Sequence, residues 1–205
     1  GTAAAERMRL DASGNLGIGT SAPIMPLDVM ANTGANALSL RTRVGDDYSF
    51  LTFRSNNGTE DLGGFAINRT AASTSNLLFY TNNGGSAAER LRIDSVGSVG
   101  IGTTPSTWAS TVYDVVQIGD SIGVGTIAGR RDGINQVNFG LNWNYDGGAT
   151  LTYVGTSFAT NYAQEAGTHR WSHAASGTAG GALTFTESMR IDASGNLLVG
   201  RTAAT

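Results

Sequence analysis

The sequence contains no cysteine and no lysine, three prolines in 205 residues, and few charged residues of either sign. The lack of cysteine excludes a disulfide framework and any thiolate metal or redox site. The net charge of −3 lacks the basic excess that a sequence-independent nucleic-acid binder needs. No apolar run approaches the roughly 18 residues of a membrane span. The sequence therefore predicts neither nucleic-acid binding nor membrane insertion.

Glycine is abundant, at 29 residues, and hydrophobic residues make up only 40% of the chain. Such a chain can bury only a thin core, which favours an elongated object or one that shares burial with partner chains. Because no disulfides are present, we expect oligomerisation to supply the missing stability. Arginine is the only strongly basic residue type, and its planar guanidinium group suits two-point pairing with carboxylates. Random drift of the amino-acid composition explains the absence of lysine equally well.

One motif occurs three times, over residues 6–19, 89–102 and 187–200. The first copy reads ERMRLDASGNLGIG, the second ERLRIDSVGSVGIG, and the third ESMRIDASGNLLVG. The copies start 83 and 98 residues apart (89 − 6 and 187 − 89). This period exceeds the roughly 20–50 residues of a solenoid repeat, so each period is expected to hold a short hairpin and a small β module.

The motif predicts a β-hairpin with a three-residue loop. Gly14, Gly97 and Gly195 stand third in the loop, where a left-handed residue is needed. The expected cross-strand pairs on one face are all apolar: Met8 with Ile18, Leu10 with Leu16, Leu91 with Ile101, Ile93 with Val99, Met189 with Val199, and Ile191 with Leu197. The alternation predicts one half-buried apolar face in every copy.

On the other hairpin face, arginine is expected opposite glycine. Arg9 faces Gly17 and Arg92 faces Gly100, whereas in the third copy Arg190 faces Leu198. Glycine there leaves room for the arginine stem or for the close approach of another chain. An ordinary hairpin with bulge glycines is the alternative.

A period of two continues between the motifs. Residues 48–54 and 76–81 predict strands that end at asparagine- and glycine-rich turns, 56–58 and 82–85. Residues 137–145 predict one alternating strand, which a turn at 146–148 leads into Leu151 and Tyr153. From Leu183 through Phe185 to Ile191 the alternation is expected to continue into the third motif. No stretch predicts an amphipathic helix, so the predicted fold is all-β.

The motif E-R-x-R-I-D-x-x-G-x-V-G-I-G-T resembles one that recurs in bacteriophage tail fibres and tailspikes, often ahead of a C-terminal intramolecular chaperone. Residues 6–20 and 89–103 carry it, and residues 187–202 carry it less fully. The resemblance implies a homotrimer in a virion tail fibre, whose partners are other tail or fibre proteins and a host cell-surface glycan or protein. Three copies about one axis would also bury the apolar hairpin faces and the strand edges.

The fold expectation is therefore an elongated, all-β homotrimeric fibre of tandem, sandwich- or prism-like modules joined by hairpins. The predicted division is residues 1–20 (first hairpin), 21–88 (first module), 89–103 (second hairpin), 104–186 (second module) and 187–205 (third hairpin). The predicted function is that of a structural component, a rigid shaft or tip segment that contributes to receptor binding.

No catalytic constellation stands out. Asp46 with Asp47 and Glu60 with Asp61 are neighbours near turns, and neighbours on a strand point to opposite faces. His169 and His173 share a strand face with Trp171, and in a trimer three imidazoles could meet one metal ion. No carboxylate adjoins them, so the sequence predicts no metal, no cofactor and no enzyme activity.

Glycan contact is the remaining hypothesis for a site. Aromatic rings beside amides and carboxylates suit sugars, and Trp108, Tyr162 and Trp171 are the candidates, the first two as surface residues in loops. Trp143 and Tyr153 are expected to fill the core. Two alternatives stay open: a tailspike-type enzyme that cleaves surface polysaccharide, which needs two carboxylates across a groove, and a bacterial surface adhesin with similar β repeats.

Overall fold

The computed structural model describes residues 6–30, 38–39, 48–120, 123–148 and 150–203. These residues form strands and turns and no helix, which confirms the all-β prediction. Contacts divide the chain into two units, Gly1–Arg43 and Val44–Thr205. The division falls inside the predicted module 21–88, and the five-part division of the chain stays a prediction.

The first unit contains one three-stranded sheet in the order β1-β2-β3. Its strands are β1 (Met8–Leu10), β2 (Leu16–Ile18) and β3 (Leu27–Val29). β1 pairs with β2 antiparallel, as a hairpin must, and β2 pairs with β3 parallel. A segment that crosses over the sheet therefore joins β2 to β3.

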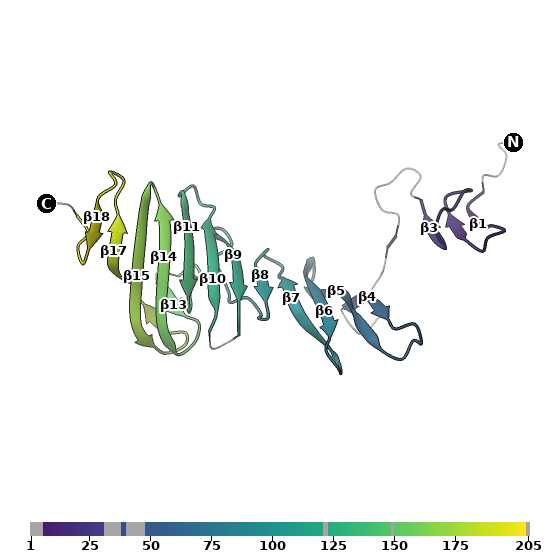
Figure 1. The fold of residues 1–205 in the computed structure, drawn as a ribbon, viewed down its shortest axis with the longest axis horizontal. Coiled ribbons are helices and arrows are strands. Elements are labelled where there is room, and N and C mark those ends of the chain that lie inside the picture. Colours follow the sequence, from purple (N-terminus) through teal and green to yellow (C-terminus); the bar gives the residue numbers. More distant parts are fainter. Residues whose placement is uncertain (1–5, 31–37, 40–47, 121–122, 149, 204–205) are drawn as a thin grey trace. The chain divides into compact units, whose positions relative to one another are not determined.

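The second unit contains a twelve-stranded sheet in the order β18-β17-β15-β14-β11-β10-β9-β8-β7-β6-β5-β4 (Figure 1). All neighbours in it are antiparallel except β8 and β9, which are parallel. The strands are β4 (Tyr48–Arg54), β5 (Asp61–Ala71), β6 (Thr74–Asn82), β7 (Ala87–Ile93), β8 (Val99–Ile101), β9 (Tyr113–Ile118), β10 (Gly125–Arg130), β11 (Gln136–Leu141), β14 (Ser157–Glu165), β15 (Thr168–Gly177), β17 (Thr186–Ile191) and β18 (Leu197–Val199).

Turn chemistry sets the ends of the early strands as predicted. β4 covers the predicted residues 48–54, and the amide of Gly58, at φ 70°, donates to the Ser55 carbonyl in the turn that follows. β6 contains the predicted run 76–81 and leads into a turn at Gly84, with φ 71°. The period-two strands and their glycine turns are thus confirmed.

A second, small sheet covers part of the large one. β12 (Trp143–Asn144), β13 (Leu151–Tyr153) and β16 (Ala182–Leu183) form it in the order β12-β13-β16. Its apolar side chains and those of β9, β10, β14 and β15 make one core with the segment before β9: Trp108, Tyr113, Val115, Ala128, Trp143, Tyr153, Ala159, Ala174 and Leu183. The prediction that Trp143 and Tyr153 fill the core is confirmed.

The predicted single strand over residues 137–145 is wrong. β11 ends at Leu141, and Asn142 adopts a left-handed conformation at φ 62°. Its buried amide holds that turn, because Nδ2 donates to the Phe158 carbonyl at 3.0 Å and Oδ1 accepts from the Gly155 amide at 2.6 Å. Asparagine tolerates this conformation better than other side chains. Trp143 consequently turns into the core beside Gly140.

The expected continuous alternation from Leu183 into the third motif is also wrong. Leu183 belongs to β16 of the small sheet, and β17 of the large sheet starts only at Thr186. The chain thus changes sheets between these residues. Phe185 packs against the core at the change, with its ring 6.0 Å from that of Trp143.

Candidate functional site: the repeated hairpin and the apolar sheet face

The three motif copies fold into the same hairpin. Every predicted pair is present, from Met8 with Ile18 to Ile191 with Leu197. The loop glycines have φ of 84°, 93° and 85° in the first, second and third copies. The register and the left-handed turn are therefore confirmed.

An aspartate holds each hairpin turn. One carboxylate oxygen of Asp11 accepts the amides of Ser13 and Asn15, at 2.9 and 2.8 Å. Asp94 and Asp192 do the same in the second and third copies. These bonds favour the ionised form, so the pKa of Asp11 lies below its usual value, chiefly through the Asn15 amide.

Each copy also carries a two-point ion pair between its glutamate and the arginine three residues later. The pairs are Glu6 with Arg9, Glu89 with Arg92, and Glu187 with Arg190, with both carboxylate oxygens engaged. The third copy replaces the other motif arginine by Ser188 and keeps this pair. Fixed carboxylate–guanidinium pairing thus lies within each strand rather than between chains in these copies.

Glycine opposite arginine makes room for the chain's own crossover segment. A Cβ on Gly17 would lie 2.7 Å from the Thr20 carbonyl oxygen, and one on Gly100 would collide with that of Thr103. The crossover is then held from the parallel strand, since Asp28 accepts the Ile24 amide at 3.2 Å and Gln117 accepts the Ser106 amide at 2.7 Å. The neighbour that the glycine admits is therefore not another chain.

The third copy carries a leucine at this position. Leu198 pairs with Arg190 and is buried. A leucine side chain would occupy the space through which the crossover passes in the first two copies. The third hairpin therefore keeps the turn and the ion pair of the motif but not the glycine that admits the crossover.

One face of the twelve-stranded sheet carries a row of apolar and aromatic side chains from β5 to β18, flanked over β4–β9 by a second apolar row, and we call it the apolar face. Cross-strand pairing places two adjacent rows on it. The central row is Ser49, Ile67, Leu77, Ile93, Val99, Val116, Ile127, Phe139, Tyr162, Trp171, Met189 and Val199. The flanking row is Leu51, Phe65, Phe79, Leu91, Ile101, Ile118, Gly125, Leu141, Thr160, His173 and Thr186.

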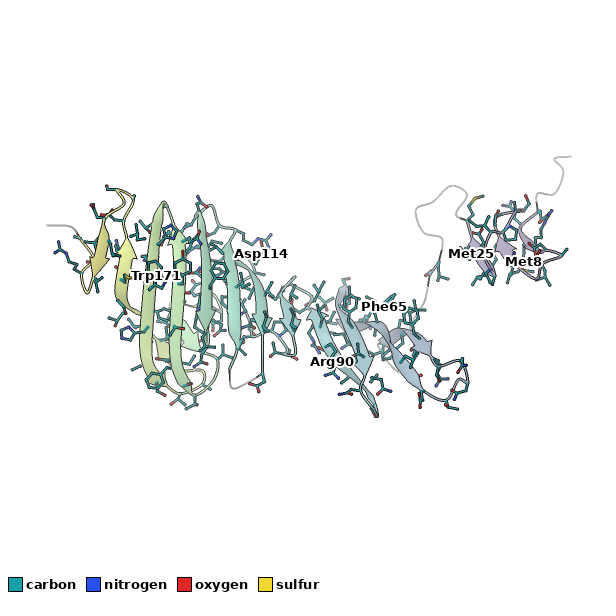
Figure 2. The ribbon with its side chains drawn as sticks, in the orientation of Figure 1. Met8, Met25, Phe65, Arg90, Asp114 and Trp171 are labelled. Atoms are coloured by element: carbon teal, nitrogen blue, oxygen red, sulfur yellow. The ribbon has the colours of Figure 1, made fainter. Side chains whose placement is uncertain are left out.

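Large side chains of the apolar face are exposed in the single chain. Ile127 is 40% exposed, Phe139 44% and Val199 67%. Phe65 and Trp171, labelled in Figure 2, both belong to this face. Single soluble chains rarely expose a contiguous apolar patch of more than a few hundred Å², and exposed apolar rows of this kind are typical of interaction surfaces.

The opposite face, the mixed face, has a different composition. Its central row is Phe50, Ala66, Leu78, Arg92, Gly100, Gln117, Thr126, Gly140, Asn161, Ser172 and Glu187. The small sheet and the crossover cover it over β9–β15, where Gln117 and Thr126 are buried. The ion pairs of the second and third hairpins, Glu89 with Arg92 and Glu187 with Arg190, lie on this face.

The three predicted glycan contacts lie in two places. Trp108 is 4% exposed in the core, with its ring 5.3 Å from that of Trp143, so the expectation of a surface side chain is wrong. Tyr162 lies in strand β14 rather than in a loop, and its ring lies 4.9 Å from that of Trp171 on the apolar face. Glycan contact by these residues stays a prediction.

The histidines also lie on the apolar face, as predicted. The Tyr162 hydroxyl lies 2.6 Å from His169 Nδ1, and His173 Nδ1 lies 2.8 Å from the Ser188 hydroxyl. Within the described part of the chain, no cluster of three histidine, aspartate or glutamate residues could hold a metal. Asp46 and Asp47 lie outside the described residues, and Asp61 pairs with Arg54. The described residues also include no helix with the length and apolarity of a membrane span.

No family model matches the chain, and no curated protein shows significant similarity to it.

Proposed function

We propose that the chain is a non-enzymatic structural segment of a bacteriophage tail fibre, and that it assembles as a homotrimer through the apolar face. The observation that carries the proposal is the central row of the apolar face, whose apolar and aromatic side chains are exposed or half-buried from β5 to β18, together with the flanking apolar row over β4–β9. Three such faces around a common axis would form one shared core. The tandem β modules would then be successive stretches of the fibre.

Burial energetics favour covering this face. Removing one large aliphatic or aromatic side chain from water contributes about 1.5–3 kcal/mol. The rows hold enough such side chains for their burial to outweigh the loss of freedom on association, which costs about 4–15 kcal/mol. A covered face would also protect the chain from non-specific aggregation.

The width of the apolar region favours three chains over two. Two sheets packed face to face use the whole length of their strands, and β14 and β15 are 9 and 10 residues long. On the apolar face, Asp114 and Gln164 already lie beyond the two rows. A narrow stripe matches a wall of a three-sided prism, in which each sheet meets both others near the axis.

The resemblance of the motif supports placing this trimer in a virion tail fibre. The parts of the motif that build the hairpin and the crossover are its turn aspartate, its ion pair and, in the first two copies, its glycine. The chain would then contribute to attachment by holding a receptor-binding surface at a fixed distance from the particle.

Native mass tests the proposal. Light scattering after size exclusion is expected to give about 63 kDa, three times the 21.1 kDa of one chain. Gels of unboiled samples are expected to show a slower band than boiled ones, because a shared core resists dissociation. A folded monomer would refute assembly through the apolar face, and a dimer would refute the three-fold arrangement.

A further inference from the structure

The mixed face has an open hollow over β4, β5, β6 and the start of β7, outside the core formed by β9–β15 and the small sheet. The cavity is about 240 Å³ and is lined by Phe50, Leu51, Thr52, Asp61, Gly63, Gly64, Tyr80 and Ala87. This volume equals that of about eight water molecules at roughly 30 Å³ each. It can hold one sugar-sized ring.

A glycine between two larger residues creates the hollow. Gly64 pairs with Thr52 on one side and with Tyr80 on the other, so one cross-strand row has no side chain at its centre. A Cβ at Gly64 would collide with the Leu51 carbonyl oxygen. The backbone therefore requires glycine here, and the hollow is a fixed feature of the fold.

Aromatic rings stand beside the hollow. Those of Phe50 and Tyr80 lie 6.1 Å apart with a tilt of 49°, and Tyr48 stacks on Phe50 at 5.5 Å. Phe50 is 55% exposed. In the hydrophobic core of the second module, by contrast, the aromatic rings of Trp108 and Trp143 are buried. Packing within the described chain does not require the rings of Tyr48, Phe50 and Tyr80 to lie exposed on the mixed face.

Polar groups complete the rim. One carboxylate oxygen of Asp61 accepts from Arg54 Nε at 2.6 Å, and its backbone carbonyl accepts from Asn82 Nδ2 at 2.7 Å. These bonds fix the position of Asp61. A carboxylate has about four acceptor sites, so Asp61 can also accept from a ligand. The Thr52 hydroxyl adds a group that both donates and accepts.

We propose that this cavity binds one neutral or amino pyranose of a cell-surface glycan. The C–H face of a pyranose packs against an aromatic ring, and its rim hydroxyls suit a carboxylate and a hydroxyl. Asp61 is paired with Arg54, so the rim carries no excess positive charge that would favour acidic sugars. The inference rests on the proposed function in one respect: the trimer covers the apolar face and leaves the mixed face open to solvent.

The test is saturation-transfer NMR and titration on the full chain, with methyl glycosides of glucose, galactose, N-acetylglucosamine, glucosamine and glucuronic acid. At least one neutral or amino glycoside is expected to bind, with transfer to its ring C–H protons. Phe50→Ala and Asp61→Asn are each expected to weaken that binding about tenfold or more, the loss expected for a stacking contact or a charged hydrogen bond.

Two variants serve as matched controls. Phe158→Ala removes an exposed phenylalanine outside the cavity, and Asp114→Asn removes an exposed aspartate that pairs with Arg131. Both are expected to bind as the wild type does. Three outcomes would each overturn the proposal. One is no binding of the neutral and amino glycosides at 10 mM, which corresponds to a binding free energy of about 2.7 kcal/mol at the 1 M standard state. The others are a preference of the chain for the glucuronide, and equal losses of binding in the control and cavity variants.

Native mass, measured on the same samples, separates this proposal from the proposed function. Trimers that bind none of the neutral or amino glycosides would refute sugar binding by the cavity and leave the proposed trimer standing. Monomers that bind, with losses confined to Phe50→Ala and Asp61→Asn, would support the cavity and overturn the trimer. The two failures are thus distinguishable.

Discussion

The strands on either side of the parallel pair β8–β9 differ in how the mixed face is covered. Over β9–β15 it lies under a second sheet and carries a core of nine buried side chains. Over β4–β8 the fully buried apolar residues are Ala66 and Leu78. The central row of the apolar face runs across both regions, whereas its flanking row is apolar over β4–β9 and contains Gly125, Thr160, His173 and Thr186 beyond. The later strands can therefore hold a hydrophobic core within one chain, whereas the earlier strands depend more on what covers the apolar face.

This contrast separates two kinds of stability, one intrinsic to the chain and one that depends on assembly. Substitutions in the core of β9–β15 should change unfolding without requiring a partner. Substitutions on the apolar face should act through association and therefore depend on protein concentration.

The largest effect is expected from Ile127→Asp on the apolar face. A carboxylate in an apolar interface costs several kcal/mol, and a trimer would bury three. Light scattering is expected to show monomers. Ile134→Asp is the control, because Ile134 lies in a turn and is 41% exposed where Ile127 is 40%. If both substitutions dissociated the trimer, or if neither did, assembly would not depend specifically on the apolar face.

Trp143→Ala tests the intrinsic core. Truncation of a buried tryptophan is expected to cost about 3–5 kcal/mol of unfolding free energy. Hydrogen exchange should rise in β9–β15 before it rises in β4–β7. Val96→Ala, at a half-exposed side chain in the turn of the second hairpin, should change stability by no more than about 0.5 kcal/mol. Uniform loss of protection across all twelve strands would show that the two regions form one cooperative unit.

Gly100→Ala tests the crossover that separates the regions. The added methyl group collides with the Thr103 carbonyl, so we expect a loss of about 1–3 kcal/mol in urea denaturation. Gly123→Ala is the control, since no atom lies within 4 Å of a Cβ there and its φ is not left-handed. Equal stability of the two variants would show that the crossover moves aside without cost.

The smallest effect is expected from acid. The Arg190 hydrogen bonds lower the pKa of Glu187 from the usual 4.5, and the Asn196 side chain and amide lower that of Asp192 from 3.8. The unfolded chain therefore binds protons first, so the contribution of these groups is complete above about pH 4.5 and is lost as the pH falls through the lowered values. Glu187→Gln should flatten the fall in melting temperature below that pH. An unchanged slope would show that the ion pair contributes nothing.

Local patterns were sufficient to predict the hairpins. The aspartate, the glycine in third position and the alternation on both sides determine the turn, the register and the apolar pairs within 14 residues. The same reasoning failed at Asn142, because its left-handed conformation depends on bonds to Phe158 and Gly155, which are distant in sequence. It failed at Trp108 for a similar reason, since the core that buries this side chain comes from other strands.

The continuous apolar face could not be predicted from single strands. Its rows depend on the order in which strands pair, including the parallel pair β8–β9, which no turn signal indicates. The alternation in residues 65–67 and 77–79 was the available clue, because apolar residues there fall on the same side as those of the hairpins. The cavity at Gly64 depends on register in the same way.

The crossover after the first two hairpins also bears on how such a chain can change over evolution. The part next to each hairpin uses a glycine, a threonine carbonyl, a proline and one polar side chain on the next strand. In the second copy the crossover then continues into the core through Trp108, and Asn144 Nδ2 donates to the Thr107 carbonyl at 2.9 Å. A module exchanged by recombination at this joint would therefore need a compatible first strand and, after the second hairpin, a place for this segment; the unequal spacing of the copies agrees with such exchange. In the third copy the Leu198 side chain fills the space that the crossover uses beside Gly17 and Gly100. A module attached there would need a connection that does not pass through this space.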